Sequence, residues 1–497
     1  MTSPRSRRTF LNDVVLGGLT ASLAGKLSPL LAATGASSGY PDRLDSLLPG
    51  FARLNPERKV RAIDRLISPA RQHPSGIMVC MPYVAAEGLR RVRTTDFEGM
   101  DQFSLNFGHR FKDITDFFAN ENSITTSGSH LAAQSIRYSV TNEPEALVAA
   151  RVAYRSLRTI YALGVEAGNP GFMGKPFHFE YSVHTTGDQY LHTLWGLWSF
   201  YPVASETAQT EIRQMLMSMA DYQIKVDYTV FNRSGGEWNN RLDGSDYNAI
   251  MAALVAAAYK LSGEKRFRDA YLFVVKSGKW QTHRRLETIV EQFKEGTYKP
   301  KAWDKIAGAN VEQGEFAHWE QIQHCQFTAI AAAIIHECVP DLFSLQDLQR
   351  VLALWWSDHP MGFDREQWNY LYWFLVSTKD LSWRPVEMTP RLPREQWFGG
   401  HPMLSFASKW VYGDCLARFQ WTAMVVARYC PKQRDEAVTF ASETLAHLQP
   451  RHLLWISDPD GRQIPAEVEY FTRFLSSEVP ECVIASYWEG RRLNLWS

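Results

Sequence analysis

The stretch 187–201, GDQYLHTLWGLWSFY, begins with a polar tetrad and continues as an apolar run rich in aromatic residues. A helix formed by this run would be apolar around nearly its whole circumference, which is typical of a helix buried on all sides. Four other stretches repeat the pattern of a polar, often acidic opening followed by an aromatic or alanine-rich run: 245–259, 318–334, 364–375 and 413–429.

Amphipathic segments alternate with these buried helices. The segments 144–165 and 433–448 each have one apolar face, which indicates an outer layer of helices. A Ser-Gly-Glu-Lys turn at 262–265 joins one buried helix to one amphipathic helix. The rhythm predicts helical hairpins with openings near 128, 188, 246, 320, 365 and 414, and therefore an all-α (α/α)6 toroid. The polar openings of its inner helices would meet at one mouth.

Few or no strands are expected. The short apolar run at 78–84, MVCMPYV, could be a strand or a buried helical turn, and 453–465, LLWISDPDGRQIP, could form a hairpin.

The first 36 residues have the features of a twin-arginine signal peptide. Paired arginines in Ser6-Arg7-Arg8-Thr9-Phe10-Leu11 precede a weakly apolar stretch and small residues suited to cleavage. The alternative is a basic tail on a cytosolic protein. We expect export to the periplasm or beyond the cell, a lead-in over 37–126 that packs on the toroid, and a catalytic toroid over 127–497.

The composition limits the partners. Lys plus Arg equals Asp plus Glu at 53 each, so no excess charge favours nucleic acid or an anionic membrane. No later run approaches the roughly 20 apolar residues that a membrane span needs. The six cysteines have no CxxC spacing, so a cysteine zinc site is not expected and buried thiols are favoured. The 17 Trp and 20 Tyr could stack on sugar rings or fill a large core.

Carboxylates at the helix openings suit glycosidic bond cleavage, which needs one acid and a second carboxylate as base or nucleophile. We predict Asp188 and Asp246 as the catalytic pair, with Glu320 as a further catalytic candidate. The alternative for each is a structural role, because Asp caps helices and anions are stabilised at helix N-termini.

Polar and aromatic residues near these openings are the predicted substrate-binding set. A Trp face beside a guanidinium would suit an acidic sugar. The histidines could instead be core residues bonded to their helical neighbours, or could form a metal site with the carboxylates. No metal motif supports the latter, so we expect no metal and no cofactor. The predicted substrate-binding residues are Gln189, Tyr190, His192, Trp238, Asn239, Arg241, His318, Trp319 and His324.

A block of motifs resembles a known family. In order, they are Ser135-Ile136-Arg137-Tyr138, Thr141 to Leu147, Gly168 to Phe172, Asp188-Gln189-Tyr190 and Gly196-Leu197. This block resembles bacterial (α/α)6-toroid glycoside hydrolases and polysaccharide lyases, especially those acting on uronic-acid-containing glycans. The resemblance implies that Asp188 and Gln189 line a sugar site. An arginine common after the Gly-x-Pro-Gly turn is absent, since Gly174-Lys175-Pro176 stands there.

Three functions remain open from the sequence. The first is an exported glycoside hydrolase acting on an oligosaccharide that contains uronic acid. The second is a lyase that uses a Tyr or His base on the same substrates. The third is a periplasmic glycan-binding protein without catalysis. Terpene cyclases share the toroid but need a DxDD run that is absent, and lanthionine cyclases need a Cys-Cys-His zinc site that is not evident. The oligomeric state is left open.

Overall fold

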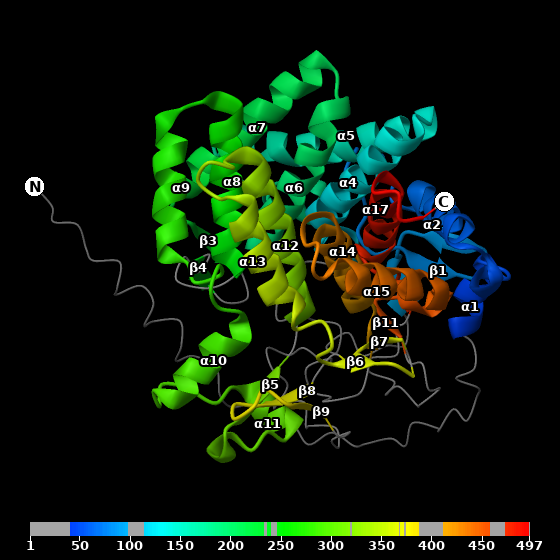
Figure 1. The fold of residues 1–497 in the computed structure, drawn as a ribbon. Coiled ribbons are helices and arrows are strands. Elements are labelled where there is room, and N and C mark those ends of the chain that lie inside the picture. The colour runs from blue at the N-terminus through cyan, green and yellow to red at the C-terminus, as the bar shows by residue number, and fades with distance from the viewer. Residues whose placement is uncertain are drawn as a thin grey trace, which may run out of the picture. The chain divides into compact units, whose positions relative to one another are not determined.

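Within the residues that the structure describes, six helices pack side by side in a closed ring (Figure 1). Each helix contacts the next in chain order, and the last contacts the first. This ring is the inner layer, and its members are α4 (Ser123–Thr141), α6 (Gly187–Phe200), α8 (Asp246–Ser262), α12 (Gln321–Cys338), α14 (Gly413–Tyr429) and α17 (Val479–Arg492).

A second layer of helices covers the ring from outside. Five of these helices follow an inner helix directly in the chain and contact it: α5 (Pro144–Glu166), α7 (Glu206–Lys225), α9 (Lys265–Ser277), α13 (Leu345–Trp356) and α15 (Arg434–His447). The sixth, α2 (Pro56–Ala70), comes from the N-terminal side and packs on α17. The predicted (α/α)6 toroid is therefore confirmed, with one hairpin assembled from the two ends of the chain.

The structure was obtained as a computed structural model. It describes residues 40–97, 114–232, 236–239, 246–318, 321–366, 368–371, 374–386, 411–457 and 473–496. The predicted signal peptide lies outside these residues, and residues 38–497 form one compact unit. No helix among the described residues is both long and apolar enough to cross a membrane.

Local sequence explains the outer helices. Asn55 caps α2 by accepting a 2.9 Å hydrogen bond from the backbone N–H of Arg58, and Pro56 occupies the first turn, where it costs no hydrogen bond. Ser344 and Asp347 form a capping box at the start of α13. The inner helices depend less on capping residues, because burial of their side chains stabilises them. Every residue from Ala249 to Ala258 of α8 is fully buried or nearly so.

Charged residues close the ring at the end of α4 opposite its opening. Glu143, which precedes α5, accepts hydrogen bonds from Arg61 of α2 at 2.7 and 3.1 Å and from Arg137 of α4. Arg137 also pairs with Asp64 of α2. On the other side of α2, Lys59 donates to the last carbonyls of α15, Leu445 O at 2.9 Å among them. The N-terminal helix is therefore fixed to both neighbours.

Short strands and small helices lie between the hairpins. The antiparallel pairs are β1 (Tyr83–Ala85) with β2 (Gly88–Arg90), β3 (Thr229–Asn232) with β4 (Gly236–Asn239), β6 (Phe363–Asp364) with β7 (Asn369–Tyr370), and β10 (Val411–Tyr412) with β11 (Ile456–Ser457). One three-stranded antiparallel sheet has the order β5 (Glu315–His318), β8 (Phe374–Ser377), β9 (Trp383–Pro385). The small helices are α1 (Tyr40–Leu47), α3 (Ile114–Asn120), α10 (Arg285–Lys294) and α11 (Ala302–Ala307).

Two sequence expectations about helices need correction. The stretch 364–375, expected to be an inner helix, instead contains β6, β7 and the start of β8. Its aromatic residues favour extended pairing, and Trp368 has a positive φ of 52° that no helix accommodates. The sixth inner helix is α17, which the sequence analysis did not propose. The expected hairpin at 453–465 begins with β11, but β11 pairs with β10, and 458–472 lie outside the described residues.

The helix bounds also refine the expected division of the chain. The fourth helix, α4, begins at Ser123, slightly before the expected toroid boundary at 127. The expected lead-in contains α2, which belongs to the outer layer of the ring.

Candidate active site

The openings of the inner helices meet inside the ring. Contacts between inner helices that are not ring neighbours locate this region. His192 of α6 lies 3.0 Å from Glu478, which directly precedes α17. Its ring also contacts the Phe327 ring of α12, with centroids 5.7 Å apart. Gln326 of α12 lies 3.3 Å from the sulfur of Cys482 in α17. All these residues lie within about two turns of the start of a helix, so α6, α12 and α17 run in the same direction and share one mouth.

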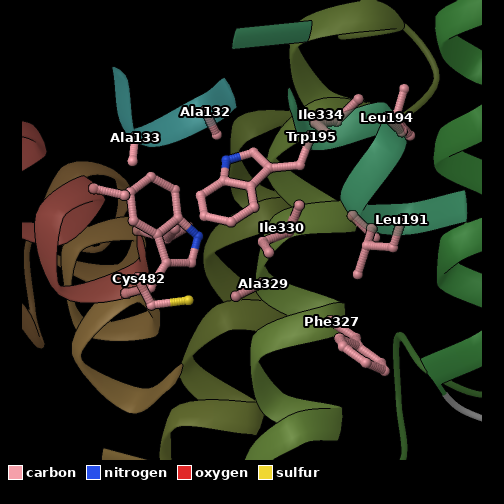
Figure 2. Packing of buried hydrophobic residues seen from close by; sticks show 14 of the residues in the cluster. Ala132, Ala133, Leu191, Leu194, Trp195, Phe327, Ala329, Ile330, Ile334 and Cys482 are labelled. Carbon is pink, nitrogen blue, oxygen red and sulfur yellow. The ribbon is translucent and has the colours of Figure 1, made fainter. Parts of the chain in front are cut away.

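Aromatic residues fill the ring one turn deeper. Trp195 of α6 and Trp421 of α14 lie on helices that face each other across the ring, and their ring centroids are 4.7 Å apart. Figure 2 shows Trp195 in this packing, with Ala132 and Ala133 of α4 and Ile330 of α12 around it. This packed layer forms a floor beneath the polar residues of the mouth.

Glu478 is the centre of the polar layer above that floor. One carboxylate oxygen contacts His192 Nε2, and the other accepts a hydrogen bond from the guanidinium of Arg418 of α14. All three side chains are at most 6% exposed. Burial alone would raise the pKa of Glu478, but the positive charges of Arg418 and His192 outweigh burial and lower this pKa to about 2. Glu478 is thus a fixed anion and is unsuited to donating a proton.

Glu481, one turn into α17, forms a second buried ion pair. Arg71, at the end of α2, donates to both of its carboxylate oxygens, at 3.0 and 3.1 Å. His130 of α4 approaches the same carboxylate at 3.8 Å. Arg71 also donates to the backbone carbonyls of Ser476 and Cys80. This group ties α2, α4 and the start of α17 together at the mouth.

Asp188 lies in the first turn of α6, and its carboxylate is half-buried. Its Oδ2 accepts a 2.9 Å hydrogen bond from the side-chain amide of the buried Gln189. Its backbone carbonyl oxygen lies 2.8 Å from Nδ1 of His192. This carboxylate is partly exposed to solvent and is held by a hydrogen bond from a buried amide. In the first turn of α6 its charge is favoured by the positive end of the helix.

The segment that leads into α6 carries further buried charge. Lys175, at the position where the resembling family often has an arginine, forms an ion pair with Glu121 just before α4. The Lys175 side chain is 5% exposed. Its backbone N–H donates a 2.7 Å hydrogen bond to His184 O, so the segment folds back on itself beside the openings of α4 and α6.

The structure brings some predicted site residues together and separates others. Asp188, Gln189 and His192 lie at the mouth, as described above. Tyr190 is fully buried, and its hydroxyl contacts the backbone of Gly171 and Met173 at 3.3 Å, so it packs the hairpin behind α6 rather than the mouth. Buried His318 in β5 contacts the Phe374 ring of the same sheet, with centroids 5.5 Å apart.

His324, in the first turn of α12, is buried and contacts the guanidinium of Arg285 of α10. The remaining predicted residues lie outside what the structure describes, at least in their side chains. The backbone places Asp246 at the first position of α8, and Trp238 and Asn239 in β4. Glu320, Trp319 and Arg241 lie wholly outside the described residues.

No sequence motif had indicated the charged residues that organise the mouth. These are Arg71, His130, Arg418, Glu478 and Glu481. A helix-start signal was present at Ser476-Ser477-Glu478-Val479-Pro480-Glu481, where serines and acidic residues surround a proline suited to a first turn. Among the described residues, no group of three or more His, Cys, Asp or Glu side chains is arranged to hold a metal ion. Five of the cysteines are buried free thiols, as expected: Cys80, Cys325, Cys338, Cys430 and Cys482.

Comparisons with known proteins give matches in structure only. No protein-family model matches the sequence, and no curated protein matches it. Solved structures with a similar arrangement include an unsaturated glucuronyl hydrolase specific for heparin, with 10% identity, a TM-score of 0.47 and coverage of 90% of this chain and 98% of that one. A D-mannose isomerase has 11% identity and a TM-score of 0.44, and the match covers 87% of this chain and 96% of that one. A sugar epimerase from a ruminal bacterium has 10% identity and a TM-score of 0.45, and the match covers 91% of this chain and 98% of that one.

Proposed function

We propose that this chain is an exported glycoside hydrolase that cleaves an oligosaccharide containing uronic acid. Asp188 exchanges the proton with the glycosidic oxygen or with water, and Asp246 at the start of α8 supplies the second carboxylate. Glu320 remains a further catalytic candidate, and the loop with Trp238 and Arg241 is proposed to bind the sugar. This chemistry needs two carboxylates on opposite sides of the scissile bond.

One observation carries the proposal. Asp188 is a half-buried carboxylate at the mouth of the toroid, and the neighbouring carboxylates that the structure describes there, Glu121, Glu478 and Glu481, each pair with a lysine or an arginine. Glu478 is held ionised by Arg418, and Glu481 is paired with Arg71. Asp188 accepts one hydrogen bond from Gln189 and has no cationic partner among the described residues. Among the described carboxylates there, we therefore assign the proton exchange to Asp188.

Two of the candidate bases for the lyase alternative, Tyr190 and His192, are poorly placed for it. It needs a tyrosine or histidine base that reaches the substrate. Tyr190 is fully buried with its hydroxyl bound to backbone groups, and burial raises the pKa of this hydroxyl, so its anion is disfavoured. His192 is fully buried, with each ring nitrogen next to an acceptor. Neither residue is placed to abstract a proton from a sugar ring.

The carbohydrate substrate and the export route rest on sequence features. The twin-arginine pattern in the first 36 residues supports export, and aromatic residues with Arg241 near the α8 opening support an acidic sugar. A glycan-binding protein without catalysis would share these features but would have no use for a proton-exchanging carboxylate.

A panel of uronic-acid oligosaccharides tests the proposal, with reducing ends and ultraviolet absorbance followed together. New reducing ends without a new chromophore are expected for hydrolysis of a saturated linkage, and loss of an existing chromophore is expected for an unsaturated substrate. Gain of a chromophore would show elimination and would overturn the hydrolase assignment. Binding without turnover on every substrate would support the binding-protein alternative.

A further inference from the structure

His192 lies between two hydrogen-bond acceptors. Its Nδ1 is 2.8 Å from the backbone carbonyl oxygen of Asp188, and its Nε2 forms a close polar contact of 3.0 Å with a carboxylate oxygen of Glu478, without hydrogen-bond alignment between those two atoms. A carbonyl oxygen has no proton to donate, so Nδ1 carries the hydrogen. A neutral ring has one N–H only, and its unprotonated, electron-rich Nε2 would then lie 3.0 Å from the carboxylate oxygen. That arrangement is repulsive, and the 0% exposure of His192 leaves no bulk water to relieve it.

Two protonation states would remove this repulsion. Either Glu478 is protonated, or His192 carries a proton on both nitrogens. The guanidinium of Arg418 binds the other oxygen of Glu478 and favours its charged form. Among the described residues near the openings of the elements around His192, the charged and titratable side chains include Glu478 and Glu481 at the start of α17, Arg418 of α14, His130 of α4, His324 of α12 and Asp188 of α6, with the thiols of Cys482 and Cys325. Of these, Glu478 is the one in ion-pair contact with the His192 ring.

We propose that His192 is a buried imidazolium and that the chain Arg418–Glu478–His192 positions Asp188. The chain starts on α14, crosses the ring through the start of α17, and ends on the backbone of the first turn of α6. It fixes the residue whose carboxylate we assign to proton exchange, so His192 and Glu478 are positioning residues. With one anion between two cations, the group carries one net positive charge, which suits an anionic sugar at the mouth.

The protonation state can be observed directly and without any substrate. A neutron crystal structure of the wild-type protein after deuterium exchange, at about pH 7.5, should show deuterium on both Nδ1 and Nε2 of His192 and none on Glu478. A single deuteron on the His192 ring, or a deuteron on Glu478, would overturn the imidazolium. This measurement does not depend on the proposed function, which could fail while the imidazolium stands.

The positioning role rests on the proposed function and is tested by kinetics. Glu478→Gln keeps the shape of the side chain and removes its charge. We expect kcat to fall on the order of 100-fold with KM little changed, because displacement of a catalytic group by about 1 Å can have that effect. His192→Gln, which can still donate one hydrogen bond, should give a similar loss. The pH dependence of kcat should also shift in Glu478→Gln, because this variant removes the negative charge next to His192, which contacts the backbone of Asp188.

Glu481→Gln is the matched control. Glu481 is equally buried and ion-paired on the same helix, but its partners are Arg71 and His130 rather than the α6 backbone. It should lower the melting temperature and leave the pH profile unchanged. If wild-type protein turns over and Glu478→Gln keeps its kcat and pH profile, the positioning role is wrong while the hydrolase assignment survives.

Discussion

Arg71 and Glu481 are 410 positions apart in the chain, yet they form a fully buried ion pair in which the guanidinium contacts both carboxylate oxygens. Arg71 ends α2, the first helix of the outer layer, and Glu481 lies in the first turn of α17, the last inner helix. The pair therefore joins the two halves of the hairpin that closes the ring. Closure of the toroid depends on a contact that no local sequence pattern specifies.

Removal of one partner of this pair should destabilise the protein strongly. Arg71→Met leaves Glu481 as an uncompensated buried charge, and we expect a loss of about 3–5 kcal/mol in the free energy of unfolding. The double variant Arg71→Met with Glu481→Leu should lose less than the single one, because no charge stays buried. Denaturant unfolding measures both. Arg350→Met breaks an exposed pair with Asp347 and should cost under about 1 kcal/mol. A double variant less stable than Arg71→Met would contradict this account.

Acid should destabilise the folded state at the end of the ring away from the mouth, where Glu143 forms its ion pairs. Hydrogen bonds from Arg61 outweigh burial, and Arg137 adds to them, so the pKa of Glu143 falls from 4.5 to about 2. A lowered carboxyl pKa stabilises the folded state above the unfolded pKa, and this stabilisation is lost as pH falls toward the folded pKa. The stability difference between wild type and Glu143→Gln should therefore shrink between about pH 4.5 and 2, by on the order of 2 kcal/mol. A constant difference over that range, measured by urea unfolding, would refute the assignment.

A glycine contact sets the spacing of α4 and α6 at the mouth. A Cβ on Gly128 would lie 2.1 Å from the backbone oxygen of His192, so α6 would have to move. Gly128→Ala should destabilise the protein by about 1–3 kcal/mol through overpacking and should also lower activity by displacing the Asp188 turn. Ser139→Ala, at an exposed position of the same helix, should affect neither property. Thermal unfolding and turnover measured together would test this, and unchanged stability in Gly128→Ala would contradict the packing.

The sequence predicted the fold well where helices are apolar on all sides. The openings expected near 128, 188, 246, 320 and 414 correspond to α4, α6, α8, α12 and α14. The stretch at 364–375 misled because aromatic residues suit a strand as well as a buried helix, and period alone does not distinguish them over such a short length. Helix α17 was not predicted as an inner helix, because it carries charged residues, which are typical of exposed helices. Its Glu481 and Glu489 are buried in the structure.

The candidate site was predictable only in part, because some of its residues come from helices far apart in the sequence. Asp188, Gln189 and His192 follow one another on a single helix, so one motif revealed them together. Their partners Glu478 and Arg418 come from distant inner helices, and only the closed ring brings them to His192. Tyr190 shares the motif but points to the outer hairpin, because successive helix positions are about 100° apart.

The most direct test of the account is the turnover of Asp188→Asn on a uronic-acid oligosaccharide that the wild-type protein cleaves. We predict that kcat falls at least about a hundredfold, because a general acid–base group is lost. The melting temperature should hardly change, because only a helix N-terminal charge is removed. Asp347→Asn makes the same change in the first turn of outer helix α13 and should keep full activity. Wild-type turnover in Asp188→Asn would contradict the central claim.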